Sequence, residues 1–220
     1  MTDKRYILID VCWTLFYSNT TFDFLDFVMK DNKEYARLRR IGKSRIGRAI
    51  NLLGYKLTHR DKERARCIRY LQGKSHAELQ TLAEQFYQEY LLPRKIEQVW
   101  KAIGGQQSAG GNRLVIVSGT LDIIAETVAR HIGAEAYYAT EMLYNNDLFT
   151  GGFRDFLLAK SDVLPHYNGF DIITDNLTDI DLVRHAQQAT IITYNNKSRW
   201  QRILPTDINV TFIEAEQARY

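Results

Sequence analysis

YILIDVCWT, residues 6–14, consists of an apolar run that is followed at once by an aspartate, Asp10. A short aliphatic run that ends in a polar residue is typical of a parallel strand buried on both faces. In an open α/β sheet, ligands bind beyond the carboxyl ends of such strands. The run therefore predicts a central strand, and Asp10 is the first candidate for a functional side chain.

Further runs along the chain have the same pattern. They lie at residues 114–118 (LVIVS), 171–174 (DIIT), 190–193 (TIIT) and 210–215. Helix-forming stretches separate several of them, at residues 121–132, 156–164 and 178–185. This alternation predicts an α/β fold with a doubly wound, mainly parallel Rossmann-like sheet.

The alternation stops between residues 16 and 93, where helix formers dominate and no strand is evident. Ser75, followed three residues later by Glu78, forms a capping-box pattern that opens a helix. We therefore expect a helical cap of residues 16–93, inserted into a core of residues 1–15 and 94–220. Glycines then predict a flexible lead into the strand at residue 114: Gly104, Gly105, Gly110 and Gly111.

The composition is that of an ordinary globular protein, with 220 residues of which 45% are hydrophobic and 25% charged. The first apolar run is too short for the core of a signal peptide, and no segment approaches membrane-spanning length. With two cysteines and no secretory signal, we expect no structural disulfide. These features predict a cytoplasmic protein without a transmembrane segment.

The charge is unevenly distributed. Residues 30–74 contain six lysines and nine arginines against four acidic residues, a local net charge of +11 within a chain whose total is +3. Such asymmetry suggests a subdomain with its own anionic partner, whereas the plainer interpretation is a solvated helical surface. Aromatic residues that could stack on bases or contact a membrane flank the run: Phe22, Phe24, Phe27 and Tyr35.

Polar residues close three of the predicted strands: Asp10, Ser118 and Asp175. Each is weak evidence alone, because Asp and Ser also cap helices that follow strands. Their order along the chain, with Lys160 between the last two, is more specific. Asp10 could attack phosphorus as a nucleophile, and Asp10 with Asp175 supplies carboxylates for Mg²⁺. Ser118 and Lys160 could hold and neutralise phosphate oxygens.

In this order the chain resembles the haloacid dehalogenase superfamily, whose motifs are a strand before D-x-D-x-T, a strand before Ser or Thr, a lysine, and a strand before paired acids. The helical insertion after the first motif resembles the phosphoserine phosphatase-like branch, as does the stretch YYATEMLYNNDLFTGGF before Lys160. The resemblance implies a Mg²⁺ site, a phosphate site and outer residues that orient them. The metal ligands would be Asp10, the carbonyl of Cys12, and Asp175; the phosphate ligands Thr14, Ser118, Gly119, Thr120 and Lys160; the outer residues Asn176 and Asp179.

Cys12 departs from the family pattern, which has at this position the aspartate that acts as acid and base. A thiol has a reference pKa of ~8.5, against ~3.9 for aspartate, so it is mainly neutral at pH 7. Cys12 would therefore be a poor general acid and base. We expect substrates with good leaving groups to be favoured.

The predicted function is a Mg²⁺-dependent phosphatase that forms an aspartyl-phosphate on a small, glycan-linked or lipid-linked phosphorylated substrate. Two alternatives are kept open. One is a catalytically impaired homologue that binds phosphate, which Cys12 favours. The other is a metal-independent dehalogenase, which the acids Asp175 and Asp179 disfavour because halide displacement by a carboxylate needs no metal. The basic cap predicts contact with a polyanion or a membrane surface.

Overall fold

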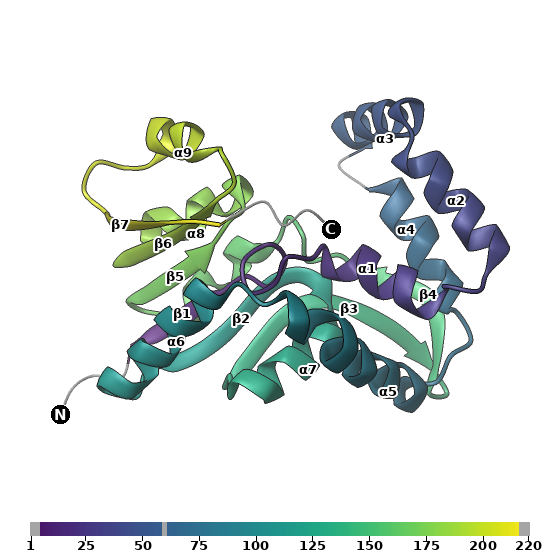
Figure 1. The fold of residues 1–220 in the computed structure, drawn as a ribbon, viewed down its shortest axis with the longest axis horizontal. Helices are drawn as coiled ribbons and strands as arrows, with labels where there is room; N and C mark the ends of the chain where they lie inside the picture. The colour runs from purple at the N-terminus through teal and green to yellow at the C-terminus, as the bar shows by residue number, and fades with distance from the viewer. Residues whose placement is uncertain (1–4, 59–60, 216–220) are drawn as a thin grey trace.

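The computed structural model describes residues 5–58 and 61–215 (Figure 1). It contains one seven-stranded sheet in the order β4-β3-β2-β1-β5-β6-β7, parallel except for the β3–β4 pair. The strands are β1 (Tyr6–Ile9), β2 (Arg113–Leu121), β3 (Ala136–Asn145), β4 (Leu148–Arg154), β5 (Phe170–Thr174), β6 (Gln188–Thr193) and β7 (Asn209–Glu214). The doubly wound, mainly parallel sheet is confirmed.

Helices cover both faces of the sheet, because its central strands are buried on both sides. Ile7 and Ile9 of β1 belong to one apolar core, whereas Leu8 belongs to the other. The first core is shared with α6 (Glu97–Gly110) and α7 (Asp122–Ile132). The second is shared with α8 (Ile180–His185) and α9 (Lys197–Ile203).

Strands β3 and β4 form a hairpin. The sequence pattern did not predict either strand. The turn of the hairpin consists of Asn146 and Asp147, which both have positive φ, +48° and +66°. Two successive positive φ angles are the geometry of the tight turns that join antiparallel strands, and Asn and Asp tolerate them best after glycine. The hairpin is the antiparallel edge of an otherwise parallel sheet.

A helical segment lies between β1 and β2 (Figure 1). It comprises α1 (Thr20–Val28), α2 (Lys33–Lys43), α3 (Arg45–Thr58), α4 (Lys62–Ile68), η1 (Arg69–Leu71), α5 (His76–Phe86), η2 (Tyr87–Leu91) and η3 (Leu92–Arg94). The predicted N-cap of α5 is confirmed, since the Ser75 hydroxyl accepts a hydrogen bond from the Glu78 N–H at 3.1 Å. Helices α2 to α4 project from the sheet, while α5 packs against α7. The cap boundaries at residues 16 and 93 stay a prediction.

Three expectations about local structure are wrong. The helix expected at 156–164 is instead a 3-10 helix, η4 (Lys160–His166), and the expected flexible lead with its glycines lies largely in α6. The aromatic residues expected to face a partner are packing residues: Phe24 and Tyr35 are buried, and the Phe27 ring lies 5.6 Å from that of Phe86. Apolar burial outweighed their proximity to the basic run. Within the described ranges, no helix is long and apolar enough to cross a membrane.

Candidate active site

Three neighbouring strands bring the predicted site residues together. Strand β1 lies between β2 and β5, so Asp10, Ser118 and Asp175 meet at the same edge of the sheet. Asp10 is fixed at both ends: its N–H donates to the Ile173 carbonyl at 3.0 Å, and its Oδ1 accepts from the Val11 N–H at 2.8 Å. The backbone therefore holds one carboxylate oxygen and leaves Oδ2 to contact a side chain.

Lys160 bridges the two sides of the site. Its Nζ lies 2.9 Å from Asp10 Oδ2 and 2.9 Å from Asp179 Oδ2, and all three side chains are at most 5% exposed. Thr174 donates to the same Asp179 oxygen at 2.7 Å. Burial lowers the pKa of Lys160, but the charges of Asp10 and Asp179 raise it by more, so the ammonium stays protonated. Lys160 is thus a fixed positive charge beside Asp10.

The Asp175 carboxyl lies in an environment that disfavours its negative charge. Burial and the charge of Asp10 raise the pKa of Asp175 to about 8, against the opposing hydrogen bond from Thr14 at 3.1 Å. Burial likewise raises the pKa of Asp179 to about 6, although Lys160 lowers it. Crowded carboxylates of this kind are stabilised by a bound cation.

The donor set fits Mg²⁺. Within residues 5–58 and 61–215, no group of three or more His, Cys, Asp or Glu side chains is arranged to hold a metal. Mg²⁺ usually keeps several waters and binds through one or two carboxylates, so Asp10 and Asp175 suffice. Asp179 Oδ1 is buried without a hydrogen-bond partner, and a metal-bound water would satisfy it.

The Cys12 thiol points into a chain of hydroxyl groups. Its Sγ lies 2.9 Å from Thr20 Oγ1, and Thr20 in turn donates to Thr120 Oγ1 at 2.7 Å. Because the Thr20 proton is used, the thiol is the donor to Thr20. Burial and the charge of Asp10 raise the pKa of Cys12 to about 11, so the thiol keeps its proton at neutral pH.

Ser118 and Gly119 lie within β2, at a register shift against β3 between Val117 and Leu121. They do not lie at a helix N-terminus, where phosphate is often held, because α7 begins only at Asp122. An irregularity of this kind leaves residues unpaired and re-aims their side chains, which explains how a strand residue can reach the site. A Cβ on Gly119 would lie 2.6 Å from the Leu157 side chain, so glycine keeps this approach open.

A cavity of about 310 Å³ joins these groups. The predicted residues that line it are Asp10, Cys12, Ser118, Gly119, Lys160, Asp175 and Asn176. The other three predicted site residues do not line the cavity and are fully or almost fully buried: Thr14, Thr120 and Asp179. Trp13 of the first motif and Phe22, which the sequence indicated as a possible contact to a partner, also line it. Sequence reasoning missed the remaining lining residues, which are Asn19, Thr21, Asp61, Arg64 and Leu157.

Arg64 of α4 is the missed residue with the most contacts to the core. Its Nη1 donates to Asp155 at 2.7 Å, and its Nη2 donates to the Gly119 carbonyl at 2.5 Å and to Thr140 at 3.0 Å. The signal in the sequence was only one arginine among the nine between residues 30 and 74, so nothing local distinguished it. It joins the cap to the part of β2 that contains Ser118 and Gly119.

Trp13 has a strained backbone next to Asp10. Its φ is +55°, in the left-handed region that a bulky residue rarely adopts. The Tyr194 hydroxyl donates to the Trp13 carbonyl at 2.6 Å, and the Trp13 N–H donates to the Ser18 carbonyl at 3.2 Å. These two hydrogen bonds hold Trp13 in its positive-φ conformation. Strained backbone conformations of this kind cluster at functional sites.

Solved structures support the same fold. A protein of unknown function from Bordetella pertussis Tohama I has a TM-score of 0.70 at 18% identity, covering 94% of this chain and 98% of that chain. A substrate-bound phosphoserine phosphatase has a TM-score of 0.56 at 15% identity, covering 96% and 94%. A phospho-aspartyl intermediate analogue of phosphoserine phosphatase has a TM-score of 0.54 at 14% identity, covering 94% and 93%. The expected resemblance to this branch is confirmed.

Sequence comparison addresses the family itself. A search of curated proteins finds no significant match. The sequence model of the haloacid dehalogenase-like hydrolases matches residues 7–180, from the first strand to the acids after β5. The chain belongs to the haloacid dehalogenase-like hydrolase family.

Proposed function

We propose that this protein is a Mg²⁺-dependent phosphate monoester hydrolase that forms an aspartyl-phosphate on Asp10. The observation that carries the proposal is the buried Asp10–Lys160–Asp179 arrangement at a cavity that Ser118 and Asp175 also reach. A carboxylate held beside a permanent cation can meet an anionic phosphate, whereas an isolated one would repel it. The similarity to phosphoserine phosphatases supports this class of reaction.

In the proposed reaction, an Asp10 oxygen attacks phosphorus and the ester oxygen leaves. Water then attacks the phosphorus of the aspartyl-phosphate, which restores the carboxylate and releases phosphate. The Ser118 oxygen accepts a hydrogen bond from the Thr120 N–H at 3.4 Å. That bond does not use the hydroxyl proton, which can donate to a phosphate oxygen. Lys160 holds the developing negative charge, and Asp179 positions Lys160.

Asp10, the Cys12 carbonyl and Asp175 would hold the magnesium ion. When bound, the ion supplies positive charge that offsets the carboxylates and the phosphoryl group. Its charge would also lower the pKa of Asp175, because it opposes the effect of burial and of the Asp10 charge.

The proposed reaction lacks an efficient general acid and base for its proton transfers. Because the Cys12 thiol stays protonated and is hydrogen-bonded to Thr20, neither an acid nor a base of matched strength stands at that position. Alkyl leaving groups would therefore depart slowly, and hydrolysis of the aspartyl-phosphate would be slow. This observation also favours the second candidate, a homologue that binds phosphate with little turnover.

The cations that line the cavity each form an ion pair with a carboxylate of the protein. They are Lys160 and Arg64. The cavity of about 310 Å³ suits a small phosphorylated head group, free or linked to a glycan or lipid outside it. The exposed basic residues of the cap do not line it.

The test is a panel of aryl, acyl and alkyl phosphates assayed with and without Mg²⁺, using wild-type protein and Asp10→Asn. We expect metal-dependent turnover of at least the aryl esters, lost in Asp10→Asn because an amide is a poor nucleophile. Phosphate binding without turnover would favour the second candidate. Retained turnover in Asp10→Asn would exclude the proposed nucleophile.

A further inference from the structure

The four most exposed large apolar side chains of the described residues lie together at one end of the cap. They are Ile41 at the end of α2 and Ile46, Ile50 and Leu53 of α3, with 57%, 74%, 66% and 62% of their surface exposed. We call these four residues the apolar patch. In α3 they are spaced i, i+4 and i+7, which places them on one helical face. Helix α3 lies at the outer end of the cap (Figure 1).

The corner between α2 and α3 makes the patch continuous. The Ser44 hydroxyl donates to the Ile41 carbonyl at 2.6 Å and accepts from the Gly47 N–H at 3.0 Å, so one side chain links the two helices. A Cβ on Gly47 would lie 2.1 Å from the Ile41 carbonyl oxygen, a contact that only glycine avoids. Ile41 and Ile50 border one hollow of about 310 Å³ between α2, α3 and α4.

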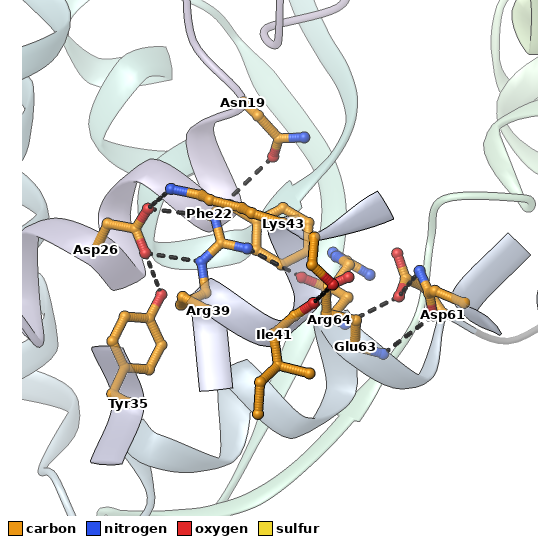
Figure 2. Close-up of polar contacts among 12 residues, drawn as sticks. Asn19, Phe22, Asp26, Tyr35, Arg39, Ile41, Lys43, Asp61, Glu63 and Arg64 are labelled. Carbon is orange, nitrogen blue, oxygen red and sulfur yellow. Dashed lines mark hydrogen bonds and ion pairs between the residues drawn. The ribbon is translucent and has the colours of Figure 1, made fainter. Parts of the chain in front are cut away.

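In the outer part of the cap a charged cluster is buried between the helices while the apolar patch is exposed, the reverse of an ordinary surface helix. Arg39 of α2 is buried and pairs with Asp26 of α1 at 2.8 Å and with Glu63 of α4 at 3.1 Å. In Figure 2 the Ile41 side chain points away from this charged cluster. The cluster joins α1, α2 and α4, and Asn51 of α3 donates to Asp61 at the start of α4 at 3.1 Å, so the helices that carry the patch are held in place.

Exposed cations lie beside the patch. Lys62 and Arg66 line the same hollow as Ile41 and Ile50, and the helices that carry the patch also expose Arg37, Arg40, Lys43 and Arg45. An apolar face bordered by lysine and arginine is the signature of a helix that lies in the interface of an anionic membrane. A second copy of this chain would bring the same excess of positive charge against itself. Nucleic acid is disfavoured because the cap aromatics Phe24 and Tyr35 are buried and cannot stack on bases.

We propose that the apolar patch and its cationic border dock the protein on an anionic lipid bilayer. Helix α4 separates this surface from the catalytic cavity: Lys62 and Arg66 border the hollow beside the patch, whereas Asp61 and Arg64 line the cavity. Docking therefore leaves the cavity open. The inference goes beyond the proposed function, because binding to a bilayer requires no turnover.

The test is flotation of the full-length protein with vesicles of phosphatidylcholine, with and without 30 mol% (about one third) phosphatidylglycerol, in the absence of substrate. Wild-type protein should float with the anionic vesicles and not with the neutral ones. Replacing Ile46, Ile50 and Leu53 together by glutamine should weaken partitioning about tenfold or more, because apolar burial in the interface is lost while helix propensity is kept. Arg40→Gln with Arg45→Gln should weaken it as well and reduce its salt dependence.

The matched control replaces two exposed apolar residues outside the cap, Leu148→Gln with Ile203→Gln, which should bind as wild type. Circular dichroism establishes that each variant is folded. Wild-type protein that stays with neither vesicle overturns the proposal. Unchanged binding of the triple variant also overturns it, because the protein would then adsorb by charge alone. A wild-type dimer that the triple variant converts to a monomer overturns it too, because a second copy would then cover the patch. None of these readouts depends on phosphatase activity.

Discussion

Cys12 is the residue whose chemistry sets the limits of the proposed reaction. Its thiol donates to Thr20, and its pKa of about 11 lies well above neutrality. A carboxylate at this position would be ionised at pH 7 or poised to share a proton, as acid and base catalysis requires. The side chain that stands beside Asp10 therefore decides which leaving groups depart.

We expect Cys12→Asp to accelerate alkyl phosphate hydrolysis by about 10²–10⁴-fold and aryl phosphate hydrolysis by much less. An alkyl alkoxide needs a proton in the transition state, whereas a phenolate leaves without one. Steady-state kcat/KM on matched alkyl and aryl esters is the measurement. Cys12→Ser is the control, because a hydroxyl keeps the contact with Thr20 and adds no carboxylate. Equal acceleration of both ester classes would contradict this role.

The Asp26 carboxylate joins α1 to α2 in the cap (Figure 2). It accepts hydrogen bonds from Tyr35 at 2.6 Å, Arg39 at 2.8 Å and Lys43 at 3.1 Å. Burial raises the pKa of Asp26, but the bonds from Arg39, Tyr35 and Lys43 lower it by more, so its value in the folded protein is below the ordinary one. Its contribution to stability is therefore present above the unfolded pKa of ~3.9 and is lost as the pH falls through the folded value.

We predict that Asp26→Asn lowers the free energy of unfolding at pH 7 by about 1–2 kcal/mol, because hydrogen bonds to a charged group are replaced by weaker ones. Wild-type stability should fall as pH drops from 5 to 3, and the variant should lose less over the same window. Urea unfolding at several pH values measures this. Asp181→Asn is the control, since the exposed Asp181–Arg184 pair should contribute under ~1 kcal/mol. Parallel loss of stability in wild type and Asp26→Asn below pH 5 would refute the assignment.

The α2–α3 corner depends on one glycine. An alanine at position 47 would place its Cβ against the Ile41 carbonyl, a backbone atom that cannot move without opening the corner. We expect Gly47→Ala to destabilise the protein by about 1–3 kcal/mol, the usual cost of overpacking. Thermal unfolding provides the measurement. Gly105→Ala in α6 is the control: a Cβ there meets nothing within 4 Å, and alanine favours a helix, so stability should rise by about 0.5–1 kcal/mol.

Arg64 connects the cap to the core across the whole molecule. It leaves α4 and donates to groups on or beside β2, β3 and β4. Because the Gly119 carbonyl is one of them, the position of the cap and the geometry of β2 at Ser118 and Gly119 are coupled. Loss of Arg64 would leave the Asp155 carboxylate and the Gly119 carbonyl without this donor.

We expect Arg64→Met to weaken docking of the cap on the core by about 2 kcal/mol, since three acceptors of the core lose a charged donor that is itself buried. Amide hydrogen exchange should increase in α4 and near Gly119 before it increases in β1. Arg64→Lys should restore docking only in part, because an ammonium cannot reproduce the planar fork of a guanidinium. Arg154→Met, which removes an exposed pair with Glu141, is the control. Exchange that is unchanged in α4 would rule out the coupling.

The central sheet could be read from the sequence because apolar runs ending in polar residues reflect burial, which is local information. The same runs indicated Asp10, Ser118 and Asp175, and their order indicated Lys160. The hairpin β3–β4 was missed because its strands alternate irregularly. The helix expected at 156–164 was wrong because only the residues from Lys160 onward form a short 3-10 helix, whose first residue turns into the site.

What the sequence by itself determined is therefore the order of β1, β2, β5, β6 and β7 along the chain, the family and the polar residues that close three of these strands. Tertiary structure alone decided that the Cys12 thiol faces Thr20, that Arg64 reaches Gly119, and that Phe24 and Tyr35 are buried while Ile41, Ile46 and Ile50 are exposed. The physical reason is that composition and spacing report which residues favour burial, whereas hydrogen-bond partners and exposure depend on contacts between segments far apart in the chain.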